Sequence, residues 1–579
     1  MPHAVNTRLA IVWAALALIL VAVGLPGILA GVFPDPDDTL RLVQVRDLLA
    51  GQGWWDLHQY RIDAPSGTLM HWSRLVDTPL ALVIAAFTPL FGQGAAETIA
   101  LILVPLLTLG AVLFVVGRLA ARLFDLEVAT MACLALAFLA PLVVQLQPMR
   151  IDHHGWQVLS VAIALSAAFD TKAWRGGQIA GLAMAVGANI SLETIPMAAV
   201  FGAVFALRWW RDGEQRWWLA SYMAALAVGM AAVFLATRGL SDLAQHCDAI
   251  STAHLAFFAI AAAGTCALAL VGNVPRYAVV AGLAISGIAG LLVFGTVSPG
   301  CLQSPFAALD PLVRDYWYIN VKEGRPVWEQ SLRLAGPVVF QLFVALGVTL
   351  RLMRRNDSRV WFDYAIILAG SIVLTLFVWR SSAFASVIAL VPLGWLLSRL
   401  RLRLTRPNMR QKLLAAVLFA AVLLPSLPAT LSAPFIDTRS KSTDAPVIRV
   451  ADSGCGIADN AVLLRSLPSG TIFAPLDIGP DILLDSGHSV VATGHHRAAD
   501  AMRDVIATYT GTTQNARASL ARYDARYVVM CSDLAEPWLF KQRNPASFAA
   551  DLMNGDPPDW LARLDVGGPP ELLVYRTER

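Results

Sequence analysis

The stretch "MPHAVNTRLAIVWAALALILVAVGLPGILAGVFPDPDD", residues 1–38, places a long apolar run with a single arginine directly before three aspartates, Asp35, Asp37 and Asp38. A run of this length can cross the hydrocarbon core of a bilayer as one helix. It carries no small-residue cleavage site, so we interpret it as a retained transmembrane helix rather than a signal peptide. The aspartates then mark the point at which the chain leaves the membrane.

The composition of the whole chain indicates the same class of protein. Of its 579 residues, 57% are hydrophobic and 15% are charged, and the mean hydropathy is +0.60. Soluble domains carry about 25% charged residues, so the sequence predicts a polytopic α-helical membrane protein. The formal net charge of +3 is too small to indicate nucleic acid, and we expect no such partner.

Apolar windows predict about thirteen transmembrane helices. They cover residues 9–32, 97–117, 127–147, 155–170, 178–191, 195–208, 217–237, 252–272, 277–297, 333–350, 361–378, 383–398 and 413–431. Residues 78–91 are also apolar, but the segment is short, and we expect it to lie in or dip into the outer face. With that choice the basic clusters all fall on the N-terminal side, which the positive-inside rule assigns to the cytoplasm of a cell inner (plasma) membrane.

The composition changes near Pro434, where hydrophobic runs shorten to strand length. We predict a transmembrane domain over residues 1–432 and an extracytoplasmic, periplasmic α/β domain over residues 433–579. The runs that read as strands are "NAVLLRSL", "GTIFAPL", "HSVVATG", "ARYVVMCS" and "ELLVYRT", and "HRAADAMRDVIATYTG" reads as a helix. Four cysteines lie on the outer side, which allows disulfides such as Cys247–Cys301 or Cys455–Cys531 without fixing the pairing.

The outer loops gather residues that bind metal ions. Carboxylates packed as closely as Asp35, Asp37 and Asp38 repel one another unless a cation neutralises them, and Mg²⁺ or Mn²⁺ prefers such oxygen ligands. A helix cap with acidic first-turn residues is the competing interpretation. The next outer loop, "PMRIDHHGWQ" at residues 148–157, adds four polar residues at the same membrane level. These are Arg150, Asp152, His153 and His154.

Two further outer features complete the pattern. The loop of residues 298–332 is rich in aromatic and acidic residues and includes Glu323, so we interpret it as a lid or acceptor groove. Arg380 stands alone at the outer end of a predicted helix, where it snorkels or pairs with an anion such as a phosphate ester.

The order of these motifs resembles the catalytic subunit of oligosaccharyltransferases, membrane glycosyltransferases with a GT-C fold. "DPDDTLRL" resembles the first metal motif of the family, with Asp35 or Asp37 as the ligand and the spacing favouring Asp37. "SGTLMHWSRLVDTPLA", which contains Trp72, resembles the segment that closes this loop. "RIDHH" resembles the second motif, and "INVKEGRPVW" resembles the motif whose glutamate completes the metal site.

The resemblance implies roles for individual residues. A Mn²⁺ or Mg²⁺ ion would be held by Asp37, Asp152, His154 and Glu323, with Arg380 on the donor phosphate. Asp37 or Asp38 would orient or deprotonate the acceptor. In the C-terminal domain only Asp477 and Gly479 match the family's Trp-Trp-Asp signature, because Pro475 and Leu476 replace the tryptophans. His495, His496 and Arg497 either form a different acceptor surface or are turn residues.

The implied activity is inverting transfer of a sugar or oligosaccharide from a polyprenyl-(di)phosphate donor at the outer face of the membrane. A protein, a lipid or a surface polysaccharide all remain open as the acceptor, and membrane lipid is an expected partner. A transporter or assembly scaffold is the alternative from another class. Transporters place charges near the bilayer midplane, whereas the ionisable residues here collect at one outer face.

Overall fold

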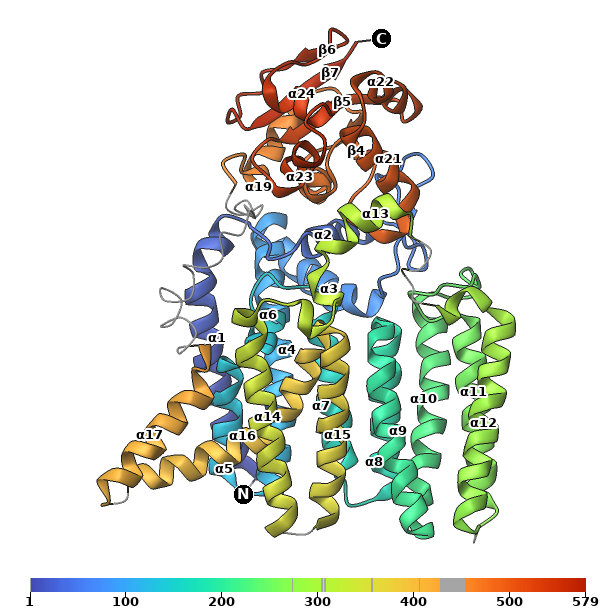
Figure 1. Cartoon of the computed structure of the whole chain (residues 1–579), viewed down its shortest axis with the longest axis vertical. Helices are drawn as coiled ribbons and strands as arrows, with labels where there is room; N and C mark the ends of the chain where they lie inside the picture. Colours follow the sequence, from blue (N-terminus) through green and yellow to red (C-terminus); the bar gives the residue numbers. More distant parts are fainter. Residues whose placement is uncertain are drawn as a thin grey trace.

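A computed structural model of the chain describes residues 2–272, 274–303, 306, 309–355, 358–405, 407–426 and 453–578. These residues form a bundle of long helices with a small α/β domain at one end (Figure 1). The predicted domain boundary at residues 432 and 433, and the end of the predicted helix 413–431, lie outside the described residues.

The bundle confirms a polytopic helical membrane protein. Its helices are α1 (Pro2–Leu29), α4 (Gln93–Leu123), α5 (Leu126–Ala135), α6 (Ala140–Leu146), α7 (His154–Ala168), α8 (Ala173–Ile190), α9 (Ile195–Arg211), α10 (Arg216–Thr237), α11 (Thr252–Leu270), α12 (Arg276–Val297), α14 (Leu332–Arg355), α15 (Ser358–Phe377), α16 (Ser382–Leu404) and α17 (Met409–Leu423). Within the described residues ten helices, α3 (Arg74–Phe91) among them, are long and apolar enough to cross a membrane, and the pair α5–α6, bent by 79°, would make eleven. Helix α7 is apolar but shorter, and α8 and α17 are not among the ten.

Close packing between α8 and α10 depends on glycine. Gly177 and Gly181, four residues apart on α8, face α10. A Cβ atom would lie 2.1 Å from Oγ of Ser221 at the first position and 2.4 Å from the carbonyl oxygen of Tyr222 at the second. Small residues at this spacing let helix backbones approach in a membrane, so α8 and α10 pack tightly at these two positions.

The predicted outer segment 78–91 forms the greater part of α3. This helix begins at Arg74, where the hydroxyl of Ser73 accepts a hydrogen bond from the N–H of Leu75. Figure 1 shows α3 beside α2 (Pro36–Leu49) at the end of the bundle that faces the α/β domain. Asp35 caps α2 by accepting from the N–H of Asp37, and Pro36 occupies its first turn, so the capping interpretation of this motif is correct for Asp35.

The first loop also contacts the C-terminal domain. Nη1 of Arg46 on α2 donates to the carbonyl oxygen of Leu484 at 2.6 Å, and the N–H of Val490 donates to the carbonyl oxygen of Arg61 at 2.8 Å. The same loop contains a short antiparallel hairpin of β1 (His58–Gln59) and β2 (Thr68–Leu69), and Arg61 lies in the connection between these strands. The loop therefore connects the bundle with the domain.

The C-terminal domain has a five-stranded sheet in the order β4-β3-β5-β7-β6. Strand β3 is parallel to β4 and β5, and β7 is antiparallel to β5 and β6. The strands are β3 (Thr471–Phe473), β4 (Ser489–Val490), β5 (Ala525–Cys531), β6 (Leu561–Arg563) and β7 (Leu572–Thr577), and the α-helices are α19 (Ile457–Asn460), α20 (Gly479–Asp485), α21 (Ala499–Thr510), α22 (Thr513–Arg522), α23 (Ala535–Arg543) and α24 (Phe548–Asn554).

Four of the five predicted strand runs and the predicted helix are confirmed. The run "NAVLLRSL" is wrong: it forms the 3-10 helix η10 (Ala461–Ser466), in which Ala461 and Leu464, three residues apart, are buried. Both disulfides that the sequence allows are present, Cys247–Cys301 and Cys455–Cys531.

A buried carboxyl in this domain gives a pH-dependent prediction. Asp481 lies in the first turn of α20, and burial, with a smaller effect of Asp485, raises its pKa to about 7. An aspartate in an unfolded chain titrates near pH 4, so the folded state favours the protonated form. This stabilisation is complete below about pH 4 and is lost as the pH rises to about 7.

We therefore expect Asp481→Asn to raise the free energy of unfolding on the order of 2–4 kcal/mol at pH 8 and to leave it nearly unchanged at pH 4. Denaturant unfolding of the full chain at both pH values measures the difference. An equal effect at the two pH values would contradict a buried, protonated Asp481.

Candidate active site

A cavity of 190 Å³ lies where the bundle meets the α/β domain. Its walls come from eight separated parts of the sequence and include Asp37, His71, His153, His154, Glu193, Asp248, Glu323, Arg380, His495 and His496. A larger cavity of 360 Å³ is lined by Asp363 and three arginines, two of which pair with its carboxylate, Arg208 at 2.7 Å and Arg211 at 2.8 Å. The smaller cavity gathers ionisable groups with polar atoms that lack a hydrogen-bond partner within the described residues.

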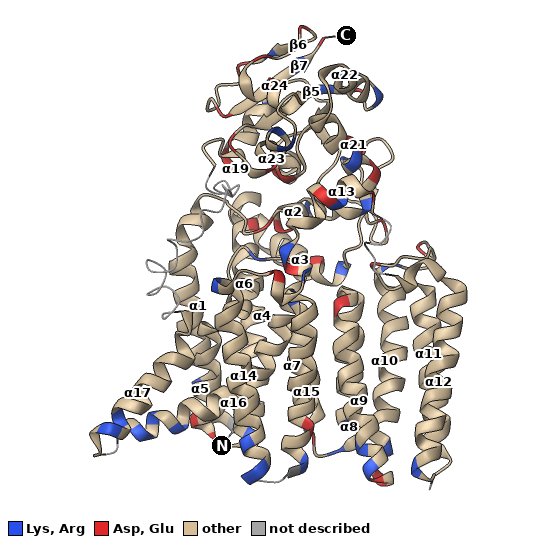
Figure 2. Cartoon of the chain, viewed as in Figure 1, with Lys and Arg blue, Asp and Glu red and all other residues tan. Residues whose placement is uncertain are grey.

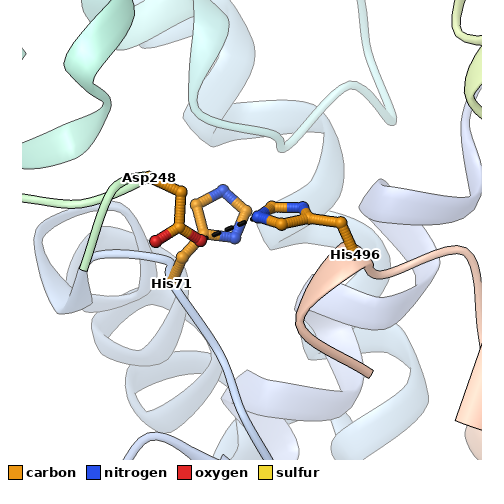
Figure 3. Close-up of side chains that lie close together, drawn as sticks. All are labelled: His71, Asp248 and His496. Carbon is orange, nitrogen blue, oxygen red and sulfur yellow. Dashed lines mark hydrogen bonds and ion pairs between the residues drawn. The ribbon is translucent and has the colours of Figure 1, made fainter. Parts of the chain in front are cut away.

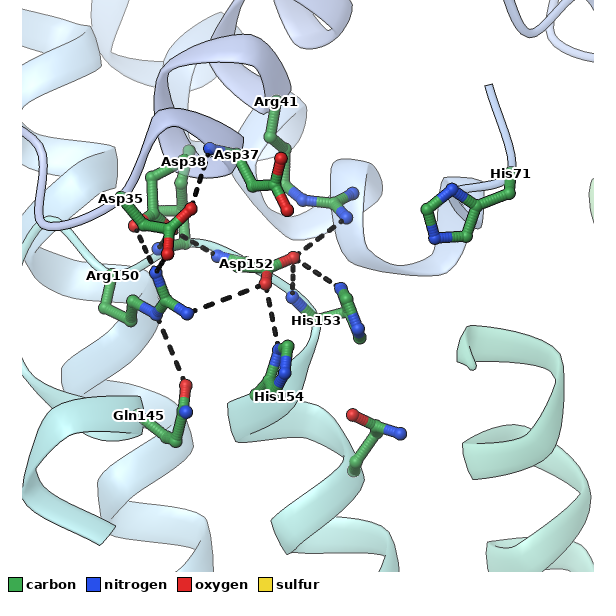
Figure 4. Close-up of polar contacts among 12 residues, drawn as sticks. Asp35, Asp37, Asp38, Arg41, His71, Gln145, Arg150, Asp152, His153 and His154 are labelled. Atoms are coloured by element: carbon green, nitrogen blue, oxygen red, sulfur yellow. Dashed lines mark hydrogen bonds and ion pairs between the residues drawn. The ribbon is translucent and has the colours of Figure 1, made fainter. Parts of the chain in front are cut away.

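Asp152 is the centre of the polar network beside this cavity (Figure 4). Its Oδ1 atom accepts from the backbone N–H of His153 at 2.6 Å and contacts Nδ1 of the same residue. Nδ1 of His154 lies 2.9 Å from its Oδ2 atom. The side chain is buried, so its negative charge fixes both imidazole rings at the start of α7.

Arg150 joins the two acidic motifs of the sequence. Its Nη1 atom lies 2.9 Å from Asp38 and 3.2 Å from Asp35, and its Nη2 atom lies 3.8 Å from Asp152. Asp38 also accepts from the backbone N–H groups of Ile151 and Asp152 at 2.9 and 2.8 Å. Asp38 is fully buried and both of its oxygens are used in this way, whereas Asp37 lines the cavity.

A second buried arginine supports Asp152 from α2. Nη2 of Arg41 lies 3.4 Å from Asp152, and Nη1 donates to Asp77 on α3 at 2.8 Å. The guanidinium stacks over the ring of Trp72, with its carbon 4.6 Å from the ring centroid. Trp72 is 1% exposed, so its place is below the cavity as a support for Arg41 rather than on an open acceptor surface.

Asp37 faces the network without a hydrogen bond to its carboxylate among the residues drawn in Figure 4. Partial burial and the neighbouring Asp35, Asp152 and Glu323 raise its pKa well above the usual value. Carboxylates that raise one another's pKa in this way mark a place where a cation is stabilised. Glu323, in the 3-10 helix η6 (Lys322–Gly324), lines the same cavity.

Arg380 reaches the cavity from the 3-10 helix η8 (Trp379–Ser381), directly before α16. Nη1 lies 2.5 Å from Glu193 and Nη2 lies 3.5 Å from Glu323. Glu193, in the turn between α8 and α9, escaped the sequence analysis. The sequence could have pointed to Glu193, because it is the one acidic residue in the short connection between two predicted helices on the outer side.

The residues present suit a divalent ion. Neither ring nitrogen of His154 has an aligned hydrogen-bond partner within the described residues, although His154 is only 5% exposed. Oε2 of Glu193 and Nε of Arg380 are likewise buried without a partner. A buried polar atom without a partner costs about 1–3 kcal/mol, so the cavity is built for a charged occupant. Asp152, His153 and His154 each offer one ligand atom, and these atoms lie within 4.8 Å of one another, so they form a donor set for such an ion.

The predicted acceptor residues of the C-terminal domain lie away from the cavity lining. The N–H of Asp477 donates to Glu536 on α23 at 3.0 Å, and burial, followed by the charge of Asp35, raises the pKa of Asp477 to about 6. A Cβ at Gly479 would lie 3.0 Å from the carbonyl oxygen of Ala492, so this glycine permits close packing inside the domain. By contrast, His495 and His496 are on the cavity wall, next to His71 and Asp248, which the sequence analysis did not single out.

Comparison with solved structures identifies the fold. The archaeal oligosaccharyltransferase AglB from Archaeoglobus fulgidus, in complex with an inhibitory peptide and a dolichol-phosphate, is 12% identical over 91% of this chain and 68% of that chain, with a TM-score of 0.67. The same oligosaccharyltransferase in complex with Zn and sulfate is 12% identical over 94% of this chain and 69% of that chain, with a TM-score of 0.58. The chain has the fold of these enzymes. The oligosaccharyltransferase-like fold expected from the sequence motifs is therefore confirmed.

A further likeness is to ArnT from Cupriavidus metallidurans bound to undecaprenyl phosphate, 13% identical over 98% of this chain and 97% of that chain, with a TM-score of 0.48. No family model and no curated protein matches the sequence. At these identities the oligosaccharyltransferase fold of the chain is established by shape, and its activity is inferred from the site.

Proposed function

We propose that the protein transfers a sugar or oligosaccharide from a polyprenyl-linked phosphate donor to an acceptor at the outer face of a membrane. The observation that carries this proposal is the convergence of Asp37, Asp152, His154, Glu323 and Arg380 on one cavity, or directly beside it, at the end of a bundle with an oligosaccharyltransferase fold. The dolichol-phosphate and the Zn and sulfate in the archaeal relatives support a phosphate-binding, metal-assisted site.

Asp37, Asp152, His154 and Glu323 would hold a divalent ion such as Mn²⁺ or Mg²⁺. When bound, such an ion offsets the negative charge that develops on the departing phosphate. Asp38 and Arg150 fix the loop that carries Asp152, through the contacts between α2 and residues 150–152. The chain therefore positions its ligands before a donor arrives.

In the transfer step, the bond between the anomeric carbon and the phosphate oxygen breaks, and an acceptor atom forms the new glycosidic bond from the opposite face of the sugar, with inversion. The carboxylate of Asp37 takes the acceptor proton, because Asp38 is engaged with Arg150 and the backbone. Arg380 contacts the donor phosphate. Glu193 holds the guanidinium in place.

We further propose an acceptor other than an Asn-X-Ser/Thr peptide, namely a hydroxyl of a lipid or surface polysaccharide. Pro475 and Leu476 stand where the family signature has tryptophans, the backbone N–H of Asp477 is engaged by Glu536 on α23, and Asp477 does not line the cavity. Radiolabelled sugar recovered in lipid or polysaccharide rather than in protein would support this assignment. Label in protein asparagine would contradict it.

The proposed orientation follows from charge. Figure 2 shows lysine and arginine gathered at the end of the bundle that holds the N-terminus, away from the α/β domain. By the positive-inside rule that end faces the cytoplasm, and the cavity then opens on the periplasmic side of an inner membrane. We place sugar transfer on that side.

Removal of the divalent ion tests the proposed chemistry directly. We expect protein in nanodiscs, freed of metal with EDTA and supplied with host polyprenyl-linked sugars and acceptor extract, to lose transfer by roughly 100-fold or more. Mn²⁺ or Mg²⁺ should restore it. Transfer that persists at the full rate in EDTA would contradict the metal site while leaving the fold assignment untouched.

A further inference from the structure

A second cluster of metal-binding residues lies on the wall of the cavity opposite Asp152. His71 follows β2, Asp248 lies in the loop between α10 and α11, and His496 begins the 3-10 helix η12 (His496–Ala498). Figure 3 shows the three side chains converging from three separate ribbons. Each offers one ligand atom, and these atoms lie within 4.8 Å of one another.

The donor set selects a class of ion. Two imidazoles and one carboxylate are typical of sites for Zn²⁺ and related transition ions, which often keep one position open. Mg²⁺ and Ca²⁺ prefer sites made of oxygen alone. The cluster shares no residue with the site around Asp37 and Asp152, where Asp152, His153 and His154 form a separate group of three ligand atoms.

The surroundings of the cluster are those of a built site. Nδ1 of His71 lies 2.9 Å from Nε2 of His495, so this contact fixes the ring of His71 and leaves its Nε2 atom for ligation. Nε and Nη2 of Arg497 donate to the two oxygens of Asp248 at 2.8 and 2.7 Å. Ligating histidines and carboxylates usually carry such outer hydrogen bonds, which set their orientation.

His495 supplies an independent sign of a missing group. It is 3% exposed, and its Nδ1 atom is buried with no hydrogen-bond partner among the described residues. Nε2 of His496 donates to Oδ2 of Asp248 at 2.7 Å, a contact that two ligands of one ion would exchange for coordination. The incomplete hydrogen bonding indicates that another group belongs here, such as a bound ion with its water.

We propose that His71, Asp248 and His496 bind a divalent transition ion such as Zn²⁺, with His495 and Arg497 as its outer supports. The ion joins the first loop, the disulfide-linked loop next to Cys247 and the C-terminal domain at one point. It thereby fixes the wall of the cavity. Binding of this ion does not depend on the proposed glycosyl transfer.

The test is metal binding by the full-length chain in nanodiscs after chelator treatment. Titration with Co²⁺, followed by its visible absorption, and with Zn²⁺ against a coloured chelator measures affinity and stoichiometry. We expect His71→Ala and His496→Ala each to weaken binding at this site by roughly 100-fold or more, and His495→Ala by about 10- to 100-fold. The matched control is His246→Ala, because His246 lies in the same loop and pairs with Asp242 at 2.6 Å outside the cluster. The affinity of His246→Ala for the metal ion should equal that of the wild type.

Two further variants keep the outcome interpretable. His496→Gln retains a hydrogen-bond donor for Asp248 but is a poor ligand, so loss of the ion with an unchanged unfolding temperature supports the proposal. Asp152→Asn disables the other candidate site and should leave the ion bound by His71, Asp248 and His496 in place. Absence of binding in the wild type, unchanged affinity in His71→Ala and His496→Ala, or loss of all binding in Asp152→Asn alone would each overturn the proposal.

Discussion

Replacing Asp152 with asparagine is expected to lower sugar transfer by roughly 100- to 1000-fold. The change keeps the size of the side chain but removes the charge that orients His153 and His154 and faces Arg41 and Arg150. Without that charge the donor set for the divalent ion is incomplete. Excess Mn²⁺ should therefore fail to restore the rate, which separates loss of a ligand from weak occupancy. The measurement is transfer of radiolabelled sugar by equal amounts of purified protein.

Removing a buried carboxylate also leaves arginines unpaired, which by itself destabilises a protein. Asp363→Asn is the matched control, because Asp363 is buried, pairs with Arg208 and Arg211, and lies at a separate cavity. We expect this variant to lose comparable thermal stability but to keep transfer within about threefold of the wild type, as is usual for changes away from a site. Similar activity losses in Asp152→Asn and Asp363→Asn would contradict a direct role for Asp152.

The sequence was sufficient to predict on which side of the membrane each motif lies. Apolar runs fix where the chain crosses, so Asp37, Asp152, Glu323 and Arg380 could be assigned to one face from the amino-acid sequence alone. The competing interpretation of the three aspartates, a helix cap with acidic first-turn residues, matches the start of α2, where Asp35 is the cap. Hydrophobic periodicity failed for "NAVLLRSL", because a short run rich in leucine suits a strand or a helical turn equally well.

Which outer loops lie next to one another could not be predicted in the same way. His71 and His495 are 424 residues apart in sequence, and Asp38 and Arg150 are 112 apart. Nothing in local spacing indicates which side of a bundle a loop covers, so the histidine cluster was invisible. The sequence also could not tell Asp37 from Asp38, because their roles depend on whether residues 150–152 take up the carboxylate. Arg41 could have been singled out from the sequence, since it lies four residues after Asp37 on one helix face.

Arg380→Gln is the second change with a large expected effect, a fall in kcat/KM of roughly 100-fold or more. Arg380 lies between Glu193 and Glu323, and its Nε atom is buried without a partner among the described residues, so the guanidinium keeps a donor for an anion. Glutamine removes the positive charge that would face the donor phosphate. Arg380→Lys should recover only part of the rate, because an ammonium group cannot span two carboxylates and a phosphate as a planar guanidinium does.

Arg325→Gln, in the outer loop that carries Glu323, provides the control for this prediction. The side chain of Arg325 pairs with Glu329 at 2.6 Å and donates to the carbonyl oxygen of Ile319 at 3.1 Å, and it does not line the cavity. We expect the control to transfer sugar at nearly the wild-type rate. Displacement of a labelled polyprenyl phosphate should show weaker binding in Arg380→Gln alone, because only that variant loses the phosphate contact. Equal donor affinity in both variants would remove Arg380 from the phosphate site and leave it as a structural partner of Glu193.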